Sequence, residues 1–261
     1  MSIEKTSSVV LATRNYRESS MLLYLFTFEQ GRLNVIAKGI RNGKNRQCVP
    51  VERGYCIEHV LYCRPHRDLQ QIANCLIREY YPAIRCSLEK TALRDLLFDV
   101  VLAGVNIAEP HQELYGFLVR FLECLEDLPS EMTNLVMFLS RSLLTLVSYL
   151  GFALDLERCV GCGRTLGTVG MCRVDIPRGM ILCQQCSGFN ASTELVLRPE
   201  LIIRLQMGEK AFLNKSDDAL PPKDLLGLLG LVLDFCRYHL DIQREIHSFS
   251  FLGHLLTIPG K

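Results

Sequence analysis

The sequence predicts an α+β fold: a small closed barrel of five strands, then a helical bundle that carries an inserted zinc module with four cysteine ligands. Three observations support this. The first eighty residues form short strand-like segments without helices between them. The residues after Pro82 place apolar side chains at helical spacing, and two Cys-x-x-Cys pairs lie within 159–186. We expect four parts: a barrel domain at 1–80, a helical domain at 81–154, a zinc-binding module at 155–190, and C-terminal helices at 191–261 that pack on the helical domain.

Composition limits the class of protein. The chain has 261 residues, of which 49% are hydrophobic, enough for real cores and too many for a disordered chain. Its apolar stretches are too short or too interrupted to span a bilayer, and its first ten residues lack the core of a signal peptide. Several of the twelve cysteines, among them Cys75, Cys124 and Cys236, stand in apolar runs as free thiols do in a reducing compartment. We therefore expect a soluble cytoplasmic protein that does not contact membranes.

Five segments in the first eighty residues have the composition of β-strands. They are rich in Val, Leu, Ile, Tyr and Phe, and turn signals such as Glu29-Gln30-Gly31 separate them. Five short strands without intervening helices favour a closed barrel, for which the OB-fold is the natural candidate. The segments are 8–13, 21–28, 32–38, 55–62 and 69–76.

The barrel region is basic, although the whole chain carries a net charge of only +1. Residues 1–80 hold twelve Lys and Arg against seven Asp and Glu, and no acidic residue lies between Glu29 and Glu52. A solvated loop at 38–46 is the plain interpretation of this charge. A one-sided positive loop beside an OB-fold groove instead favours binding of a nucleic-acid strand. Aromatic side chains suited to base stacking, most of which we assign to the barrel core, are Tyr16, Tyr24, Phe26, Phe28, Tyr55 and Tyr62.

After Pro82 the spacing of apolar residues becomes helical. Leu, Phe and Val recur every three or four residues across 93–101 and 114–125. Pro129-Ser130 marks a break before a helix at 131–150. Two more helical patterns follow the cysteine module, at 198–213 and at 222–240, and Pro221-Pro222 opens the second.

The cysteine pairs are the most specific motif. Cys159 and Cys162 form the first pair, Cys183 and Cys186 form the second, and twenty residues separate the pairs. Two residues between thiolates let both sulfurs of a pair reach one tetrahedral ion, which is typical of a four-cysteine zinc site. Four sulfurs leave no open position for a reactive water, so we expect one structural Zn²⁺ that braces the module. Cys172, between the pairs, is an alternative ligand.

Enzyme signatures are missing from the sequence. His111 and Glu113 ahead of the cysteine pairs are superficially similar to the pattern of nucleobase deaminases. That pattern needs a proline directly before a single pair, whereas Arg158 and Leu182 precede the pairs here. The phosphate-binding loop of nucleotide hydrolases and the nucleophile elbow are also missing. We expect a binding protein rather than an enzyme.

Two sequence blocks bracket most of the chain. The first is the run 9–20 with Leu25-Phe26-Thr27, Gly31 and Ala37-Lys38-Gly39; the second is Tyr149-Leu150-Gly151-Phe152 with the two cysteine pairs. In content and in order, these blocks resemble the RecO family of bacterial DNA repair proteins.

The resemblance implies a recombination mediator of the RecF pathway with an OB-fold, a helical bundle and a zinc module. Such a protein binds single- and double-stranded DNA and anneals complementary strands. With RecR, it helps load RecA onto DNA coated by single-strand-binding protein (SSB). The resemblance also implies a nucleoid-associated location in the bacterial cytoplasm and contact between the helical region and the C-terminal tail of SSB, for which Arg94 and Arg120 are candidates. The candidate DNA-binding cations are Arg14, Arg17, Arg32, Lys38, Arg41, Lys44 and Arg46.

Two other classes of protein share these features. An RNA-binding or transcription-associated protein with an OB-fold and a zinc module would have the same composition, and the ratio of DNA to RNA affinity separates it from a repair mediator. A protein scaffold would use the zinc and the helices but would not bind nucleic acid at any salt concentration.

Overall fold

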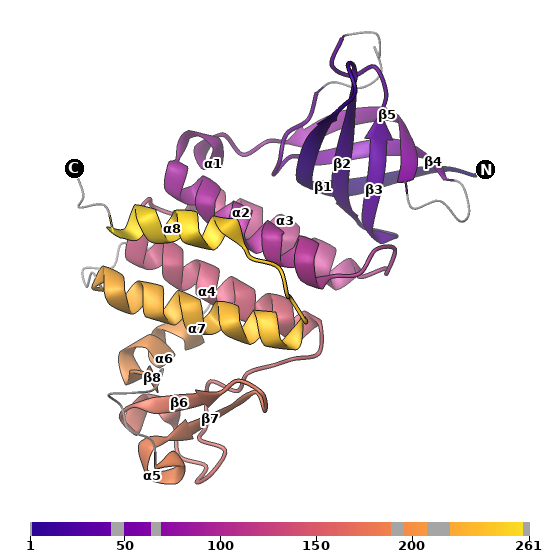
Figure 1. The fold of residues 1–261 in the computed structure, drawn as a ribbon. Helices are drawn as coiled ribbons and strands as arrows, with labels where there is room; N and C mark the ends of the chain where they lie inside the picture. The colour runs from indigo at the N-terminus through magenta and orange to yellow at the C-terminus, as the bar shows by residue number, and fades with distance from the viewer. Residues whose placement is uncertain (1, 43–49, 64–68, 189–195, 208–219, 258–261) are drawn as a thin grey trace. The chain divides into compact units, whose positions relative to one another are not determined.

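A computed structural model of the chain describes residues 2–42, 50–63, 69–188, 196–207 and 220–257 (Figure 1). The chain forms two compact units. The first unit combines Met1–Cys86 with Val105–Glu126, and the second combines Ser87–Gly104 with Asp127–Lys261. The helices that follow the barrel in sequence are therefore shared between the two units.

The first unit is built on a closed five-stranded barrel (Figure 1). The strand order is β1-β2-β3-β5-β4, and β4 closes the barrel by pairing with β1. Every pairing is antiparallel except the one between β3 and β5. This closure confirms the predicted OB-type barrel. The strands are β1 (Ser2–Tyr16), β2 (Ser20–Thr27), β3 (Gly31–Ala37), β4 (Cys56–Cys63) and β5 (Leu69–Glu79).

Alternation along the strands fills the barrel interior. Residues of β3 are buried and half-buried in strict turn, as expected where successive side chains point to opposite faces. A register shift between Val10 and Ala12 bends β1, so that one strand pairs with β4 through its first half and with β2 through its second. Buried apolar side chains fill the barrel interior. They include Val10, Leu23, Leu25, Leu33, Val35, Ile57, Leu61 and Ile72.

Two helices, α1 (Pro82–Cys86) and most of α3 (Gln112–Asp127), complete the first unit. The Phe28 and Tyr115 rings meet edge to face with centroids 5.5 Å apart, which ties α3 to the end of β2. The segment before α3 lies so close to β3 that a Cβ on Gly31 would stand 1.9 Å from the carbonyl oxygen of Glu109. Only glycine fits that contact.

The second unit contains four longer helices, of which α4 is the central one. It is buried around most of its circumference, as expected of a helix enclosed by others. It packs beside α7 and α2, and α2 also packs against α8 (Figure 1). These helices are α2 (Leu88–Gly104), α4 (Met132–Tyr149), α7 (Pro222–His239) and α8 (His247–Thr257).

The cysteine module is a small three-stranded sheet in the order β7-β6-β8. Nε2 of His239, on α7, donates to the carbonyl oxygen of Ile176 at 2.9 Å, and the Phe152 and Phe235 rings lie against the same imidazole. This contact fixes the sheet to the helices of its unit. The module elements are η1 (Leu166–Thr168), β6 (Cys172–Asp175), β7 (Met180–Cys183), α5 (Gln184–Ser187), β8 (Val196–Leu197) and α6 (Pro199–Gln206).

Three features differ from the sequence-based expectation. Helix α8 was not predicted, because its two histidines, two serines and Gly253 are poor helix formers, and its packing on α2 overrides that propensity. The helix predicted at 198–213 ends at Gln206. Cys75, expected as a free thiol, is disulfide-bonded. Within the described residues, no helix has the length and apolar character needed to cross a membrane.

A buried histidine makes the barrel sensitive to acid. The side chain of His59, on β4, is 1% exposed, and its Nε2 lies 2.6 Å from Oγ of Ser8. Its Nδ1 has no hydrogen-bond partner among the described residues. Burial lowers the pKa of His59 from 6.5 to about 4, so the folded barrel holds this imidazole neutral at pH values where the unfolded chain protonates it.

We expect the barrel to lose stability as the pH falls from 6.5 to about 4, because only the unfolded chain gains a proton at His59 in that range. The loss at the acid end is on the order of 3 kcal/mol. Denaturant unfolding followed at several pH values measures it. His59→Gln should flatten the profile, whereas His247→Gln, at an exposed position on α8, should leave it unchanged. An unaltered slope in His59→Gln contradicts the prediction.

Candidate nucleic-acid face and metal centre

Strands β1, β2, β3 and β5 present two cross-strand rows on the outside of the barrel. Directly paired residues point to the same side of a sheet, so the register decides which side chains stand together. We call this surface the outer face. Its first row is Arg14, Leu22, Ile36 and Gln71, and its second row is Ala12, Tyr24, Asn34 and Leu69.

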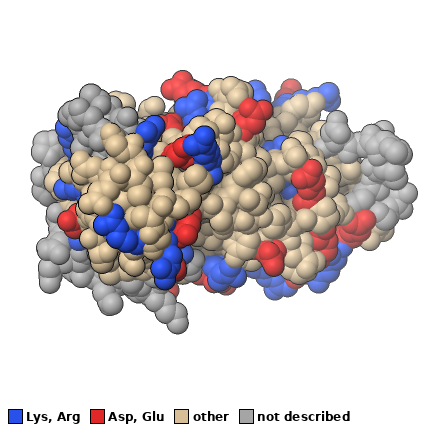
Figure 2. All heavy atoms as spheres, turned by 90° about the horizontal axis from the view of Figure 1, so that it is seen from below, with Lys and Arg blue, Asp and Glu red and all other residues tan. Residues whose placement is uncertain are grey.

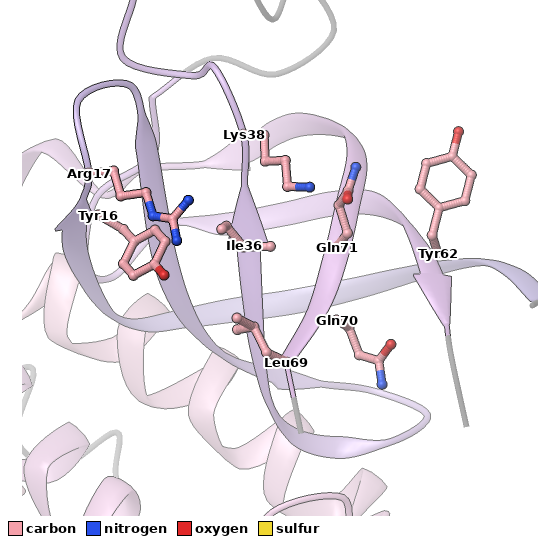
Figure 3. A pocket seen from close by; sticks show the side chains of 8 residues that line it. All are labelled: Tyr16, Arg17, Ile36, Lys38, Tyr62, Leu69, Gln70 and Gln71. Atoms are coloured by element: carbon pink, nitrogen blue, oxygen red, sulfur yellow. The ribbon is translucent and has the colours of Figure 1, made fainter. Parts of the chain in front are cut away.

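A pocket of about 300 Å³ opens at the end of this outer face (Figure 3). Its cations are Arg17 and Lys38, which flank Ile36 in Figure 3, and Tyr16 lies beside Arg17. The pocket combines positive charge, an apolar floor, aromatic rings and amide groups, which are the groups that hold a nucleotide strand. Its lining residues are Tyr16, Arg17, Ile36, Lys38, Tyr62, Leu69, Gln70 and Gln71.

The turn between β1 and β2 is held in a specific conformation. Arg17 has a φ of 52°, in the left-handed region that non-glycine residues seldom adopt. Arg41 compensates by donating from Nη1 to the carbonyl oxygen of Arg17 at 3.2 Å, and its backbone N–H donates to the carbonyl oxygen of Ser19 at 3.0 Å. The guanidinium of Arg17 lies over the Tyr16 ring, 5.3 Å from its centroid. These contacts keep the Arg17 side chain at the rim of the pocket.

The structure brings four of the seven predicted DNA-binding cations to this end of the barrel. Arg17 and Lys38 line the pocket, Arg14 stands in the first row of the outer face, and Arg41 supports the turn. Arg32 lies apart, near the opposite end of β3, where its carbonyl oxygen accepts from the backbone N–H of Ala108 at 2.8 Å. Lys44 and Arg46 fall outside the described residues.

Sequence reasoning missed half of the pocket. Gln70 and Gln71 carry no charge and belong to no motif, and Leu69 looks like any apolar strand residue. They reach the site because β5 pairs in parallel with β3, a pairing between segments more than thirty residues apart that composition does not encode. The alternation of β3 was the available signal, since Asn34 and Ile36 lie on one side of that strand and Lys38 continues the same two-residue period directly after it.

The two arginines suggested as partner-binding residues belong to different units. Arg94 is 8% exposed on α2 and its Nη2 lies 2.8 Å from Oδ1 of Asp95. Arg120 is exposed on α3.

The four paired cysteines converge as the sequence predicts. The sulfurs of Cys159, Cys162, Cys183 and Cys186 all lie within 4.8 Å of one another. The Cys162 and Cys183 sulfurs are 3.8 Å apart, which matches the edge of a tetrahedron with zinc–sulfur bonds of about 2.3 Å. A Cβ on Gly161 would stand 2.8 Å from Cβ of Cys186, so glycine is required for the pairs to close. The group can hold a metal ion.

Hydrogen bonds favour the thiolate form of two of the four sulfurs, those of Cys159 and Cys162, whereas hydrogen bonds with neighbouring cysteines raise the pKa of Cys186 to about 12. The backbone N–H of Cys183 donates to Sγ of Cys159 at 3.3 Å. Burial raises the pKa of Cys159, but backbone N–H donors from Cys183, Cys162 and Gly161 outweigh it, and the pKa is lowered overall. A hydrogen bond from the Arg164 side chain lowers the pKa of Cys162 to about 6. Both shifts favour the thiolate, which is the form that binds metal.

Cys172 lies outside the cysteine cluster. It is buried in β6 opposite Cys183, and its Sγ donates to the carbonyl oxygen of Gly170 at 3.4 Å. Burial raises the pKa of Cys172 to about 11, which keeps it a protonated thiol. The structure therefore favours the four paired cysteines over Cys172 as ligands.

We expect purified protein to hold one zinc ion per chain and Cys183→Ala to lose it, because three thiolates leave the shell incomplete. Cys172→Ala is the matched control, since it removes an equally buried thiol from the same sheet, and it should retain the metal. Metal analysis by mass spectrometry measures both.

Chelation should expose 155–190 to protease before 1–80, because the module has little core of its own. Zinc retained by Cys183→Ala, or an unchanged cleavage order, contradicts this expectation.

The chain matches known families over nearly its whole length. Residues 1–81 match the family described as "Recombination protein O N terminal", and residues 86–245 match "Recombination protein O C terminal". The "DNA repair protein RecO" of Chlorobium limicola is 29% identical over 98% of this chain and 99% of that protein, and the one from Moorella thermoacetica is 27% identical over 98% and 94%. The RecO of Prosthecochloris aestuarii is 30% identical over 62% of this chain and 60% of that protein. The chain belongs to the RecO family of DNA repair proteins.

Proposed function

We propose that this chain binds single- and double-stranded DNA through the outer face and the pocket of its barrel and anneals complementary strands. With RecR, it would help load RecA onto DNA coated by SSB. The observation that carries the proposal is the convergence of Arg14, Arg17 and Lys38 with Tyr16 and two glutamines on an OB-type barrel. OB-folds bind oligonucleotides on the surface formed by strands 2 and 3 and the loops beside them.

Each group in the pocket has a role in this proposal. Arg17 and Lys38 neutralise phosphates and release counterions, which supplies affinity without reading sequence. Tyr16 and Tyr62 in the pocket, with Tyr24 on the adjoining outer face, offer rings for base stacking, which is tolerant of sequence because every base has a π-face. The Gln70 and Gln71 amides donate and accept hydrogen bonds at the edges of unpaired bases. The result is a surface for strands of any sequence.

Annealing follows from charge screening. Two DNA strands repel each other through their phosphates, and cations held between them lower that repulsion within a Debye length of about 10 Å at 0.1 M salt. Nothing in this mechanism consumes a nucleotide, so we propose a mediator and not an enzyme. In this proposal the SSB tail binds the helical region. The burial of Arg94 favours the exposed Arg120 of the two candidate contacts.

The zinc module acts in this proposal as a brace. Figure 2 shows one face of the molecule on which basic and acidic side chains are interspersed. Within the module, residues 155–188 carry four arginines against three acidic residues, so its charge is also mixed. A surface of mixed charge offers no continuous positive patch along which a phosphate backbone could bind. We therefore assign DNA contact to the barrel and assign stability of the helical unit to one structural Zn²⁺.

We expect Arg17→Ala with Lys38→Ala to weaken binding to single strands of every sequence and to lower the slope of log K against log salt by about 1.4, since two phosphate contacts are lost. Fluorescence anisotropy at several salt concentrations measures this slope. Lys5→Ala with Arg78→Ala is the control matched in charge, because both cations stand on the barrel but pair with Glu58 at 2.6 and 2.7 Å. Equal salt slopes in the two double variants would show that Arg17 and Lys38 do not contact DNA phosphates, which contradicts the role proposed for the pocket.

We expect the protein to accelerate pairing of complementary strands that are coated with SSB, and the Arg17 and Lys38 double variant to lose most of this acceleration. Annealing of labelled oligonucleotides, followed by energy transfer, measures the rate. The same strands made of RNA test the alternative function: tighter binding to RNA than to DNA favours an RNA-binding protein. No acceleration on SSB-coated DNA would overturn the mediator role.

A further inference from the structure

Arg164 lies two residues after the first cysteine pair, and the structure fixes its backbone. Its carbonyl oxygen accepts from the backbone N–H of Cys159 at 2.9 Å, while the N–H of Gly163 donates to the carbonyl oxygen of Cys159 at 2.8 Å. Gly163 has a φ of 72°, a conformation that suits glycine. This tight turn directs Arg164 back toward the cysteines that precede it.

The guanidinium of Arg164 contacts one sulfur of each cysteine pair. Nε donates to Sγ of Cys162 at 3.3 Å, and Nη2 lies 3.8 Å from Sγ of Cys183. Nη2 also donates to Oε1 of Gln185, which stands between the two cysteines of the second pair. A single planar group thus joins both pairs, which are separated by twenty residues of sequence.

The charge at the centre explains why a cation belongs there. Four thiolates around one divalent ion leave a net charge of −2. An arginine in contact with two of the sulfurs offsets half of that charge, and its flat fork can donate to both at once, which the single ammonium of lysine does less well. Arg164 is exposed, so solvent screens part of this attraction. Because of this screening, we expect Arg164 to contribute little to the overall stability of the fold. Its main effects should be on metal retention and on the reactivity of the exposed Cys162 sulfur.

We propose that Arg164 is a positioning residue of the metal centre, which ties the two cysteine pairs together and protects the Cys162 thiolate from loss of metal and from electrophiles. A hydrogen bond to sulfur draws on the electron pair that would otherwise attack an electrophile, so it lowers nucleophilicity. Gln185 orients the guanidinium from the second pair. The inference rests on the zinc site proposed above.

Zinc release to the chromophoric chelator 4-(2-pyridylazo)resorcinol tests this role on the full-length, zinc-loaded protein. We expect Arg164→Gln to weaken zinc retention by about 10- to 100-fold, the usual effect of losing a partner that hydrogen-bonds a metal ligand. Arg164→Lys should recover part of the loss. Arg158→Gln is the matched control: it removes an arginine from the same turn whose Nη1 donates to the carbonyl oxygen of Gly163 and not to sulfur. It should behave as wild type.

Two further measurements separate positioning from general stability. In protein loaded with Co²⁺, the sulfur-to-metal charge-transfer band should shift in Arg164→Gln but not in Arg158→Gln, since only the first removes a donor from sulfur. In zinc-loaded protein, where the metal already holds Cys162 as a thiolate, its alkylation by iodoacetamide should also be faster in Arg164→Gln. Equal zinc release from Arg164→Gln and Arg158→Gln, with unshifted cobalt spectra, would overturn the inference. Failure to bind zinc at all in wild type would instead refute the zinc site itself, and neither result depends on DNA binding.

Discussion

The barrel depends on one strand that is long enough to pair on both sides. β1 pairs with β4 through its first half and with β2 through its second, and the irregularity between Val10 and Ala12 supplies the bend. Without this closure, β2 and β4 would expose unpaired edges that invite association with other chains. The same ladder decides which residues face outward. Arg14 lies on the outside of β1. The register pairs it, through Leu22 and Ile36, with Gln71 on the same side of the sheet. The outer face is thus a consequence of closure.

Local chemistry made much of this architecture predictable from sequence. Turn residues and β-branched runs located the five strands, and the Cys-x-x-Cys spacing located the cluster of four cysteines, because both signals act over a few neighbouring residues. Contacts between distant segments were not predictable. The glutamines of the pocket reach it through the β3–β5 pairing, and α3 belongs with the barrel through contacts such as that of Tyr115 with Phe28. Arg164 carries no motif, and its contacts with both cysteine pairs are visible only in the folded chain.

The chain places opposite electrostatics in its two units. On the barrel, Arg17 and Lys38 stand in an open pocket where positive charge attracts polyanions over several ångströms. In the cysteine module, Arg164 contacts the Cys162 sulfur directly, and four thiolates around the proposed divalent ion would make that centre locally negative. The first arrangement suits a partner that must come and go, since screening by salt and water keeps each contact weak. The second would suit a permanent metal centre, because the cation that contacts the sulfurs belongs to the same chain.

The parallel junction of the barrel has a mechanical consequence. Among the described residues, which leave out 64–68 just before β5, β3 and β5 share three paired positions, from Asn34 with Leu69 to Ile36 with Gln71, and the other barrel ladders are longer. A short parallel ladder is the least stable pairing in a closed sheet. We expect local opening of the barrel to begin with the hydrogen bonds between β3 and β5. Ile36, Leu69, Gln70 and Gln71 line both sides of this pairing and also line the pocket. A nucleic-acid strand bound in the pocket would therefore contact both β3 and β5. Binding would hold these two β-strands together and make the barrel more rigid.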